Sequence, residues 1–458
     1  MSLIRYNEPT SMLTSTRRTL IDWYVRNRAR SKALFDLVSE EAYDTRPIAL
    51  RYPIVFYEGH LPAFSFNTLV KRGLGRPSID VHLESLFARG IDPHESEGSP
   101  TGQDHDARMG WPAREALQQF AVEADRQVLD ALAHGDIERP GDPLLDRADA
   151  AFAILEHEAM HQETLLYMWH RLPLDQKRRP AGYAAPVDGP VPRAEWIEVP
   201  AGRATLGLDR NDLVFGWDNE QPASSVDVAA FRIERHNVTN AAFLEFVEAG
   251  GYLDEQWWRP DDWAWVQAER LRHPLFWEQR GDGWCWRGMF DLVPLPLSWP
   301  VYVSQAEASA YARWRGARLP TEAEFQRAAY GTPSTGGRRY PWGDAPPTAE
   351  HGALDFSGWD PHPAGSHPAG RSAWGIDDLV GNGWEWTSTV FAPFAGFRAI
   401  PSYPEYSADF FDGEHFVMKG ASPVTARELV RPTFRNWFRA RYPYVYATFR
   451  CAGDLSST

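Results

Sequence analysis

Two histidines, His157 and His161, stand four residues apart in a stretch that predicts one long helix from about Pro143 to Leu172. Because residues four apart lie one above the other on a helix face, the two imidazoles point the same way. Neutral imidazoles so placed can share one metal ion. A chance pair on a solvated helix is the alternative. The pattern therefore predicts a helical domain and raises the hypothesis of a metal centre completed by a ligand from another helix.

Bulk properties exclude several classes of protein. The 458 residues suffice for two or three domains, and 43% of them are hydrophobic, enough for ordinary packed cores. A net charge of −15 argues against nucleic-acid binding, which needs clustered lysine and arginine. Cys285 and Cys451 provide no disulfide framework and fit a reducing compartment. Without a signal core or a membrane span, we expect a cytoplasmic protein with neither nucleic-acid nor membrane partners.

The first 175 residues predict a four-helix bundle. The helical patterns cover residues 14–38, 54–72, 112–134 and 143–172. Pro112 is well placed for a first helical turn, whereas Gly59 and Pro62 weaken the second helix. Residues 91–110, rich in Gly, Asp and Ser, read as a loop between the second and third helices.

The amino-acid composition and the predicted elements change after the bundle. Residues 176–194 are rich in Pro, Gly and Ala and predict a linker. In residues 195–458, short strand-like runs alternate with turns, and most of the 20 tryptophans lie there. The clearest runs are strands at 196–199 and 225–228 and helices at 240–249 and 304–315. We therefore predict an α+β chain with a bundle at 1–175 and a second domain at 195–458.

His60, on the second predicted helix, supplies a third imidazole. Facing helices of a bundle can bring side chains together in the core, so His60, His157 and His161 would form a three-histidine set. Three protein ligands leave coordination positions open, as a catalytic metal requires, although zinc also accepts three imidazoles. The alternative for His60 is a core histidine. Glu163 is either an acceptor for a ligand imidazole or a surface carboxylate, and His170 is expected to be exposed or interfacial.

Several motifs in one order resemble the sulfoxide synthases of ergothioneine and ovothiol biosynthesis. They are the H-x3-H-x-E pattern of His157, His161 and Glu163, and the runs RLPTEAEF (318–325), YPWGD (340–344), GNGWEWT (381–387) and RPTFRNWF (431–438). The resemblance implies a DinB-like four-helix bundle followed by a formylglycine-generating-enzyme-like domain, a C-type lectin variant. Cys285 and Cys451 do not fit the cysteine pair of formylglycine-generating enzymes, so sulfatase activation is disfavoured.

The resemblance implies a hercynine oxygenase-type enzyme that uses Fe(II) and O2. Its substrates would be hercynine and cysteine, or γ-glutamylcysteine, joined through a C–S bond as a sulfoxide. Close alternatives are 5-histidylcysteine sulfoxide synthesis from unmethylated histidine and selenoneine synthesis from a selenosugar. A DinB-type zinc-dependent thiol transferase and a lectin-like binding module are more distant. We expect a monomer or small homo-oligomer.

Substrate-binding residues are likewise carried over from the resemblance. Asn436, Trp437 and Phe438 would line the pocket for the methylated amine and carboxylate, since aromatic faces suit a trimethylammonium group. Arg439 or Arg441 would bind the carboxylate of the thiol substrate, with a surface ion pair as the alternative for each.

Two positions depart from the pattern of ergothioneine enzymes. Met160 stands where many of these enzymes carry a glutamine that recognises imidazole. They also carry a proton-donating tyrosine in the loop after WEWT, but residues 390–394 contain no hydroxyl. We therefore expect the catalytic tyrosine to be Tyr442, Tyr444 or Tyr57, the last one turn before His60.

Overall fold

The computed structural model describes residues 17–88, 110–184, 187–212, 214–334 and 336–455, which fall into two compact units. The bundle unit contains the described residues up to 183 together with residues 401–403. The C-terminal unit contains the described residues of 184–400 and 404–455. The boundary at residue 183 falls inside the predicted linker, and all of the predicted loop 91–110 except residue 110 lies outside the described residues.

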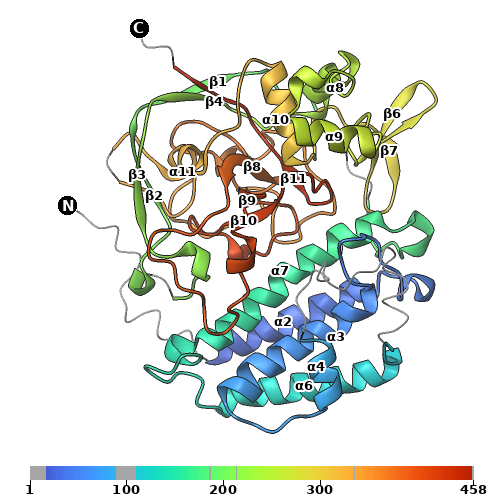
Figure 1. Cartoon of the computed structure of the whole chain (residues 1–458), viewed down its shortest axis with the longest axis vertical. Coiled ribbons are helices and arrows are strands. Elements are labelled where there is room, and N and C mark those ends of the chain that lie inside the picture. The colour runs from blue at the N-terminus through green and yellow to red at the C-terminus, as the bar shows by residue number, and fades with distance from the viewer. Residues whose placement is uncertain (1–16, 89–109, 185–186, 213, 335, 456–458) are drawn as a thin grey trace. The chain divides into compact units, whose positions relative to one another are not determined.

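The bundle unit is helical, as predicted. Its α-helices are α2 (Arg17–Phe35), α3 (Ile54–Ser65), α4 (Val81–Leu86), α6 (Arg114–His134) and α7 (Asp149–Arg171). Helices α2, α3, α6 and α7 pack against one another (Figure 1). Buried Leu69, Val128 and Ile154 belong to one core cluster, which α2, α6, α7 and the segment after α3 form. Since each fully buried side chain of this kind contributes about 1.5–3 kcal/mol, apolar packing is the main stabilising term.

Helix α7 is also fixed by a polar network on its side facing α2. Glu158 is buried, and its Oε1 accepts from the Ser31 hydroxyl at 2.7 Å and from Arg28 Nη1 at 2.9 Å. One turn along, the amide nitrogen of Gln162 donates to the Asn27 carbonyl at 2.9 Å and to Ser31 Oγ at 3.0 Å. Buried polar groups that are paired in this way hold two helices rigidly together.

Helix α3 is regular at its start and irregular beyond Pro62. Pro62 has no N–H to donate to the carbonyl four residues earlier, which weakens the helical ladder at that point. From Phe66 to Gly73 the chain is π-helical, so the predicted second helix continues in a different form. Such π-helical turns are rare and frequently lie at functional sites.

The C-terminal unit is built on four small sheets. Its strands are β1 (Trp196–Val199), β2 (Gly202–Leu206), β3 (Ser224–Val228), β4 (Phe231–Glu234), β5 (Trp277–Arg280), β6 (Gly283–Arg287), β7 (Leu292–Pro294), β8 (Gly383–Val390), β9 (His415–Ala421), β10 (Asn436–Arg439), β11 (Ala447–Thr448) and β12 (Ala452–Asp454). The sheet orders are β1-β4-β12, β10-β9-β8-β11, β2-β3 and β5-β6-β7. In the largest sheet only the β8–β11 pair is parallel.

The WEWT motif forms strand β8 in the interior of this sheet. Trp386 is fully buried, and Glu385 receives two hydrogen bonds from Arg450, at 2.7 Å from Nε and 2.6 Å from Nη2. Both charged side chains are 0% exposed. Such a two-bond pair is stable only because each charge satisfies the other, so this part of the motif holds the sheet together.

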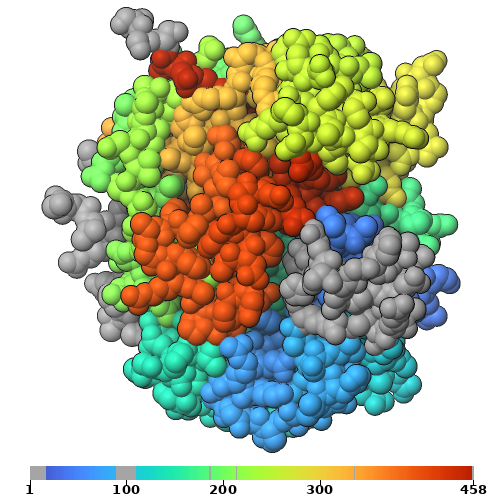
Figure 2. Space-filling model, in the orientation of Figure 1, coloured from blue at the N-terminus to red at the C-terminus, as the bar shows by residue number. Residues whose placement is uncertain are grey.

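Four helices flank the sheets: α8 (Asn240–Glu248), α9 (Pro260–Ala268), α10 (Gln305–Trp314) and α11 (Glu322–Tyr330). Helices α8 and α10 confirm the helices predicted at 240–249 and 304–315. Thr321 caps α11 and closes a capping box with Glu324. On the face drawn in Figure 2, yellow-green and orange segments, around α8–α9 and beyond β8, form much of the surface of this unit. None of the helices in the described ranges has the length and apolarity needed to cross a bilayer.

Candidate metal centre

The three predicted histidines meet in the interior of the bundle unit. His60 comes from α3, and His157 and His161 come from successive turns of α7. Their ring centroids lie 4.3–5.1 Å apart, and one nitrogen of each lies within 4.8 Å of the others. All three side chains are buried. One ion could therefore lie among them.

A hydrogen bond fixes the tautomer of His60. Its Nδ1 lies 2.8 Å from the carbonyl oxygen of Phe87, and a carbonyl can only accept, so Nδ1 carries the proton. Nε2 of the neutral ring is then a bare lone pair, which faces Nε2 of His157 at 3.3 Å. An acceptor on the far nitrogen of a ligand histidine orients the ring and raises its basicity.

Gly59 explains how Phe87 comes so close to α3. A Cβ added at Gly59 would lie 2.5 Å from the Phe87 ring, far inside van der Waals contact. Gly59 has a low helix propensity, but its missing side chain makes room for Phe87, whose carbonyl orients His60. The segment before Phe87 is held too, since Glu84 accepts from Lys71 at 2.6 Å and from the N–H of Ile79 at 2.7 Å.

Burial keeps the imidazoles of the cluster in their neutral form. Burial lowers the pKa of His60 to about 4. Burial and the neighbouring histidine rings lower the pKa of His157 and His161 well below the usual value, and for His161 the Arg51 guanidinium acts in the same direction. All three imidazoles are therefore neutral near pH 7 and offer lone pairs. Nδ1 of His157 and Nδ1 of His161 have no hydrogen-bond partner among the described residues. The donor set fits a divalent metal ion of borderline softness.

Aromatic rings enclose the cluster and limit ring rotation. Phe64 stacks on His157 with centroids 3.5 Å apart and planes 10° apart, and Phe56 stacks on His60 at 5.0 Å. Tyr403, from the loop residues of the bundle unit, lies edge-on to His157 at 5.9 Å and to Phe64 at 5.3 Å. Aromatic rings thus surround the three imidazoles, and two of these rings are phenols, Tyr403 beside His157 and Tyr57 near His161.

Tyr403 supplies a hydroxyl in the loop that begins with residues 390–394, which contain none. The prediction considered residues 390–394, whereas the loop runs on to β9, and Tyr403 lies nine residues beyond Phe394. The full loop between β8 and β9 contains both Tyr403 and Tyr406. Only the structure distinguishes them, since Tyr406 stacks on Trp217 at 4.0 Å inside the C-terminal unit.

Other predicted residues of the bundle unit are placed as follows. Tyr57 is buried near His161, with ring centroids 6.0 Å apart, and burial raises its pKa. Met160 and Glu163 are half-buried on α7, next to and two residues beyond His161. Of the two alternatives for His170, the exposed one is wrong, because the side chain is only 1% exposed. Helix α7 is covered around its whole circumference near its C-terminal end, which its sequence alone does not reveal.

The predicted substrate residues lie on β10 of the C-terminal unit and are divided by the alternation of a strand. Asn436 and Phe438 share one face, and Trp437 and Arg439 share the other. Trp437 stacks on Phe391 at 4.3 Å with planes 4° apart. Their role in substrate binding stays a prediction.

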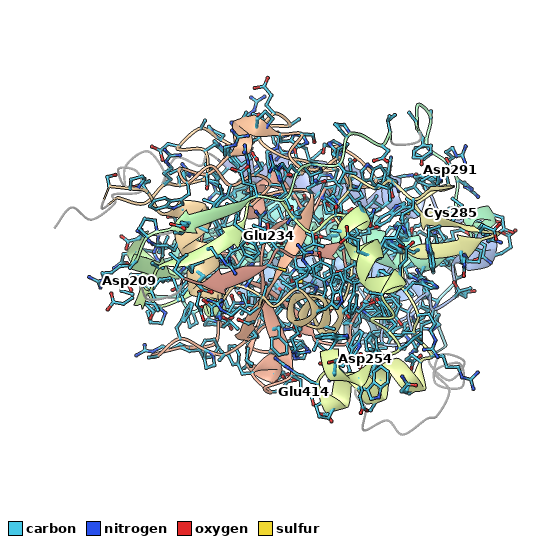
Figure 3. All side chains as sticks on the ribbon, turned by 90° about the horizontal axis from the view of Figure 1, so that it is seen from above. Asp209, Glu234, Asp254, Cys285, Asp291 and Glu414 are labelled. Carbon is cyan, nitrogen blue, oxygen red and sulfur yellow. The ribbon has the colours of Figure 1, made fainter. Side chains whose placement is uncertain are left out.

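Of the remaining predicted residues of the C-terminal unit, Arg439 is the last residue of β10, and Arg441, Tyr442 and Tyr444 follow this strand. Arg439 lies 3.7 Å from Glu414, which Figure 3 places at the edge of the molecule, and Arg441 lies 3.6 Å from buried Asp262. Tyr442 is buried and stacks on Phe438 at 5.0 Å, and Tyr444 meets Tyr442 edge-on at 5.0 Å. Both arginines therefore already have acidic neighbours.

The two cysteines are free and far apart. Cys451 is buried next to Glu234, which accepts from its N–H at 2.8 Å, while Cys285 lies on β6, well separated from Glu234 in Figure 3. Burial and the Glu234 carboxylate raise the pKa of the Cys451 thiol. Neither cysteine is part of a dithiol site, which agrees with the disfavoured sulfatase-activating activity.

Family models match both units. Residues 24–165 match the DinB superfamily, and residues 184–455 match the sulfatase-modifying factor enzyme 1-like domain. A hercynine oxygenase of Mycolicibacterium thermoresistibile is 37% identical over 381 residues, which cover 76% of this chain and 83% of that one. Ergothioneine biosynthesis protein 1 of Neurospora crassa is 28% identical over 98% of this chain and 59% of its own length.

A formylglycine-generating enzyme of Mycobacterium tuberculosis is 36% identical over 237 residues, or 43% of this chain and 75% of that one. The C-terminal unit alone accounts for a match of that kind. The chain has the domain arrangement of a two-domain oxygenase. A DinB-type bundle that carries a histidine cluster precedes a sulfatase-modifying-factor-type domain. It belongs to the hercynine oxygenase family.

Proposed function

We propose that this protein is an Fe(II)- and O2-dependent sulfoxide synthase of ergothioneine biosynthesis. It joins hercynine to cysteine or γ-glutamylcysteine through a C–S bond. The observation that carries the proposal is the buried three-histidine cluster in a chain that is 37% identical to a hercynine oxygenase over most of its length. We further propose a cytoplasmic location, with which the two free cysteines agree.

Iron is the ion that we propose for the cluster. The donor set itself accepts either zinc or iron, but zinc is redox-silent, and an oxygenase needs a metal that activates O2. When bound by His60, His157 and His161, Fe(II) would supply that activation and a template for the two substrates. The protein contributes the neutral imidazoles, the Phe87 carbonyl that orients His60, and an aromatic cage that keeps water out.

Tyr403 is the proton donor in this proposal. Its ring is next to His157, and it is half-buried, so its phenol can hold a proton beside a substrate at the cluster. Tyr57 is the second choice, because it also lies near a cluster histidine. Tyr442 and Tyr444 remain predictions whose place in the reaction rests on the family resemblance.

Substrate recognition is assigned to side chains on β10 and after it. The aromatic faces of Trp437 and Phe438 suit the trimethylammonium group of hercynine, and Asn436 suits its carboxylate. Arg441 or Arg439 would bind the carboxylate of the thiol substrate, in place of its present acidic neighbour. Met160, one residue from His161, would lie against the substrate imidazole.

The test is an aerobic assay of the purified protein loaded with Fe(II). Hercynine is supplied with cysteine in one reaction and with γ-glutamylcysteine in another, and products are identified by mass. We expect one oxygenated adduct that contains both substrates. Absence of such a product with both thiols would reject the proposal.

Parallel reactions separate the alternatives. Unmethylated histidine tests 5-histidylcysteine sulfoxide formation, and a selenosugar tests selenoneine synthesis, since each product has its own mass. A zinc-loaded sample without O2 tests thiol transfer. Activity in that last sample alone would replace the oxygenase with a transferase.

A further inference from the structure

A single loop passes from the C-terminal unit into the bundle unit and back. Residues up to Ile400 and from Pro404 onward belong to the C-terminal unit, while residues 401–403 belong to the bundle unit. The loop carries Tyr403, the phenol beside His157. It contains no helix or strand between 400 and 407, so its shape depends on side chains that hold it.

Both ends of the loop are tied to one carboxylate. Asp218 Oδ2 accepts from the N–H of Ile400 at 3.3 Å, and Oδ1 accepts from the hydroxyl of Ser407 at 2.5 Å. Asn219 Nδ2 donates to Ser407 Oγ at 2.9 Å. Asp218 is only 4% exposed, so these contacts are shielded from water. Ile400 and Ser407, seven residues apart, are thus both bound to the Asp218 carboxylate.

The tip of the loop is held from the bundle side. Arg72, in the π-helical segment that follows α3, donates to the carbonyl of Pro401 at 2.9 Å and to that of Ser402 at 3.2 Å. Because both acceptors are backbone atoms, the guanidinium fixes the path of the chain directly before Tyr403.

We propose that Asp218 and Arg72 are positioning residues that hold the loop 400–407 in place, so that the phenol of Tyr403 stays beside His157. Asp218 fixes the two ends and Arg72 fixes the tip. The catalytic part of this inference rests on the proposed function. The positional part does not.

The charge state of Asp218 makes its hydrogen bonds to the two ends of the loop sensitive to pH. Burial raises the pKa of Asp218 to about 6, and the neighbouring Glu220 carboxylate acts in the same direction. Glu220 is itself paired with Arg431, and Arg435 donates to the Asn219 carbonyl. As the pH falls through about 6, one oxygen of Asp218 takes up a proton and loses acceptor capacity, so the loop ends are held less tightly.

Global stability changes with the opposite sign. The pKa of Asp218 is higher in the folded protein than in the unfolded chain, so between about pH 6 and pH 4 the folded state binds more protons. The contribution of this group to stability therefore rises as the pH falls through that window. Loosening of the loop below pH 6 can thus be distinguished from unfolding.

Asp218→Asn and Arg72→Gln test the proposal by amide exchange and by turnover. We expect exchange of the 400–407 backbone to rise on the order of 10-fold in each variant, since a charge-assisted hydrogen bond is lost. We expect kcat to fall with little change in KM, and metal content to stay the same. The matched controls, Asp227→Asn and Arg18→Gln, alter exposed side chains and should leave both readouts unchanged.

Coupling to Tyr403 separates positioning from general damage. If Asp218 acts through the phenol, Asp218→Asn should cost nothing further in a Tyr403→Phe background. The acidic limb of the wild-type pH profile, near pH 6, should disappear in Asp218→Asn. Unchanged exchange of the loop in both variants, or an equal further loss in the Tyr403→Phe background, would overturn the inference.

A different result would overturn only the proposed function. A wild-type protein that forms no sulfoxide with either thiol rejects the synthase assignment. Amide exchange needs no turnover, so the two variants would still show whether Asp218 and Arg72 hold the loop.

Discussion

The histidines and Tyr403 reach the same site in different ways. His157 and His161 stand on a helix whose geometry alone aligns them, and hydrogen bonds of Glu158 join that helix to α2. Tyr403 stands on a loop without regular structure, and hydrogen bonds to Asp218 and Arg72 define its path. A periodic element places its functional groups by repetition, whereas a loop needs a separate contact for each turn of the chain. The positions of the three histidines should therefore tolerate changes in their surroundings better than the position of the phenol does.

Removal of a ligand gives the largest expected effect. In His161→Ala the cluster keeps only two imidazoles, so we expect stoichiometric Fe(II) binding and sulfoxide formation both to be lost. Metal content after desalting and turnover are the measurements, with circular dichroism as a check on the fold. His134→Ala, on the exposed face of α6, is the matched control. Full metal retention in His161→Ala would show that another residue completes the site.

Removal of the phenol should separate chemistry from metal binding. Tyr403→Phe keeps the ring packing against Phe64 and removes only the hydroxyl. We expect sulfoxide formation to fall about 10²–10⁴-fold, the range for a general acid, with metal content unchanged. Tyr57→Phe serves as the comparison near His161. A larger loss in Tyr57→Phe than in Tyr403→Phe would transfer the proton-donor role to Tyr57.

The difference between the two regions explains what the sequence could predict. The helices and the alignment of His157 with His161 follow from local spacing, which one sequence contains. His60 could be added only by assuming that its helix faces theirs in a bundle. The position of Tyr403 depends on a carboxylate almost two hundred residues earlier in the chain, and no local pattern encodes such a contact. The sequence left open whether His170 is exposed for a related reason, because coverage of the helix depends on the rest of the fold.

The support behind His60 should have an intermediate effect. Gly59→Ala forces a methyl group to within 2.5 Å of the Phe87 ring, so Phe87 must move and its carbonyl leaves Nδ1 of His60. Loss of such an acceptor typically costs 10–100-fold in metal affinity. Competition with a chelator measures the affinity. Gly75→Ala, a substitution with no neighbour within 4 Å but with strained backbone, controls for the loss of a glycine.

If Gly59→Ala binds metal as tightly as the wild type, the Phe87 carbonyl is not needed to orient His60. That result would leave the helix geometry alone responsible for the cluster and would sharpen the contrast with the loop. A weakened site would instead show that even the regular region depends on one contact from outside its helices.

The network behind α7 should have the smallest effect on function. In Glu158→Gln the buried partner of Arg28 loses its charge, although Arg28 still lies 2.8 Å from Asp125. Leaving a buried charge partly unsatisfied costs about 1–3 kcal/mol of unfolding free energy. Denaturant unfolding measures that loss, and metal content of the folded fraction should be unchanged, because His157 and His161 remain on one helix face. A drop in metal content without a drop in stability would mean that helix rotation, rather than helix geometry, sets the site, and the contrast between the two regions would then disappear.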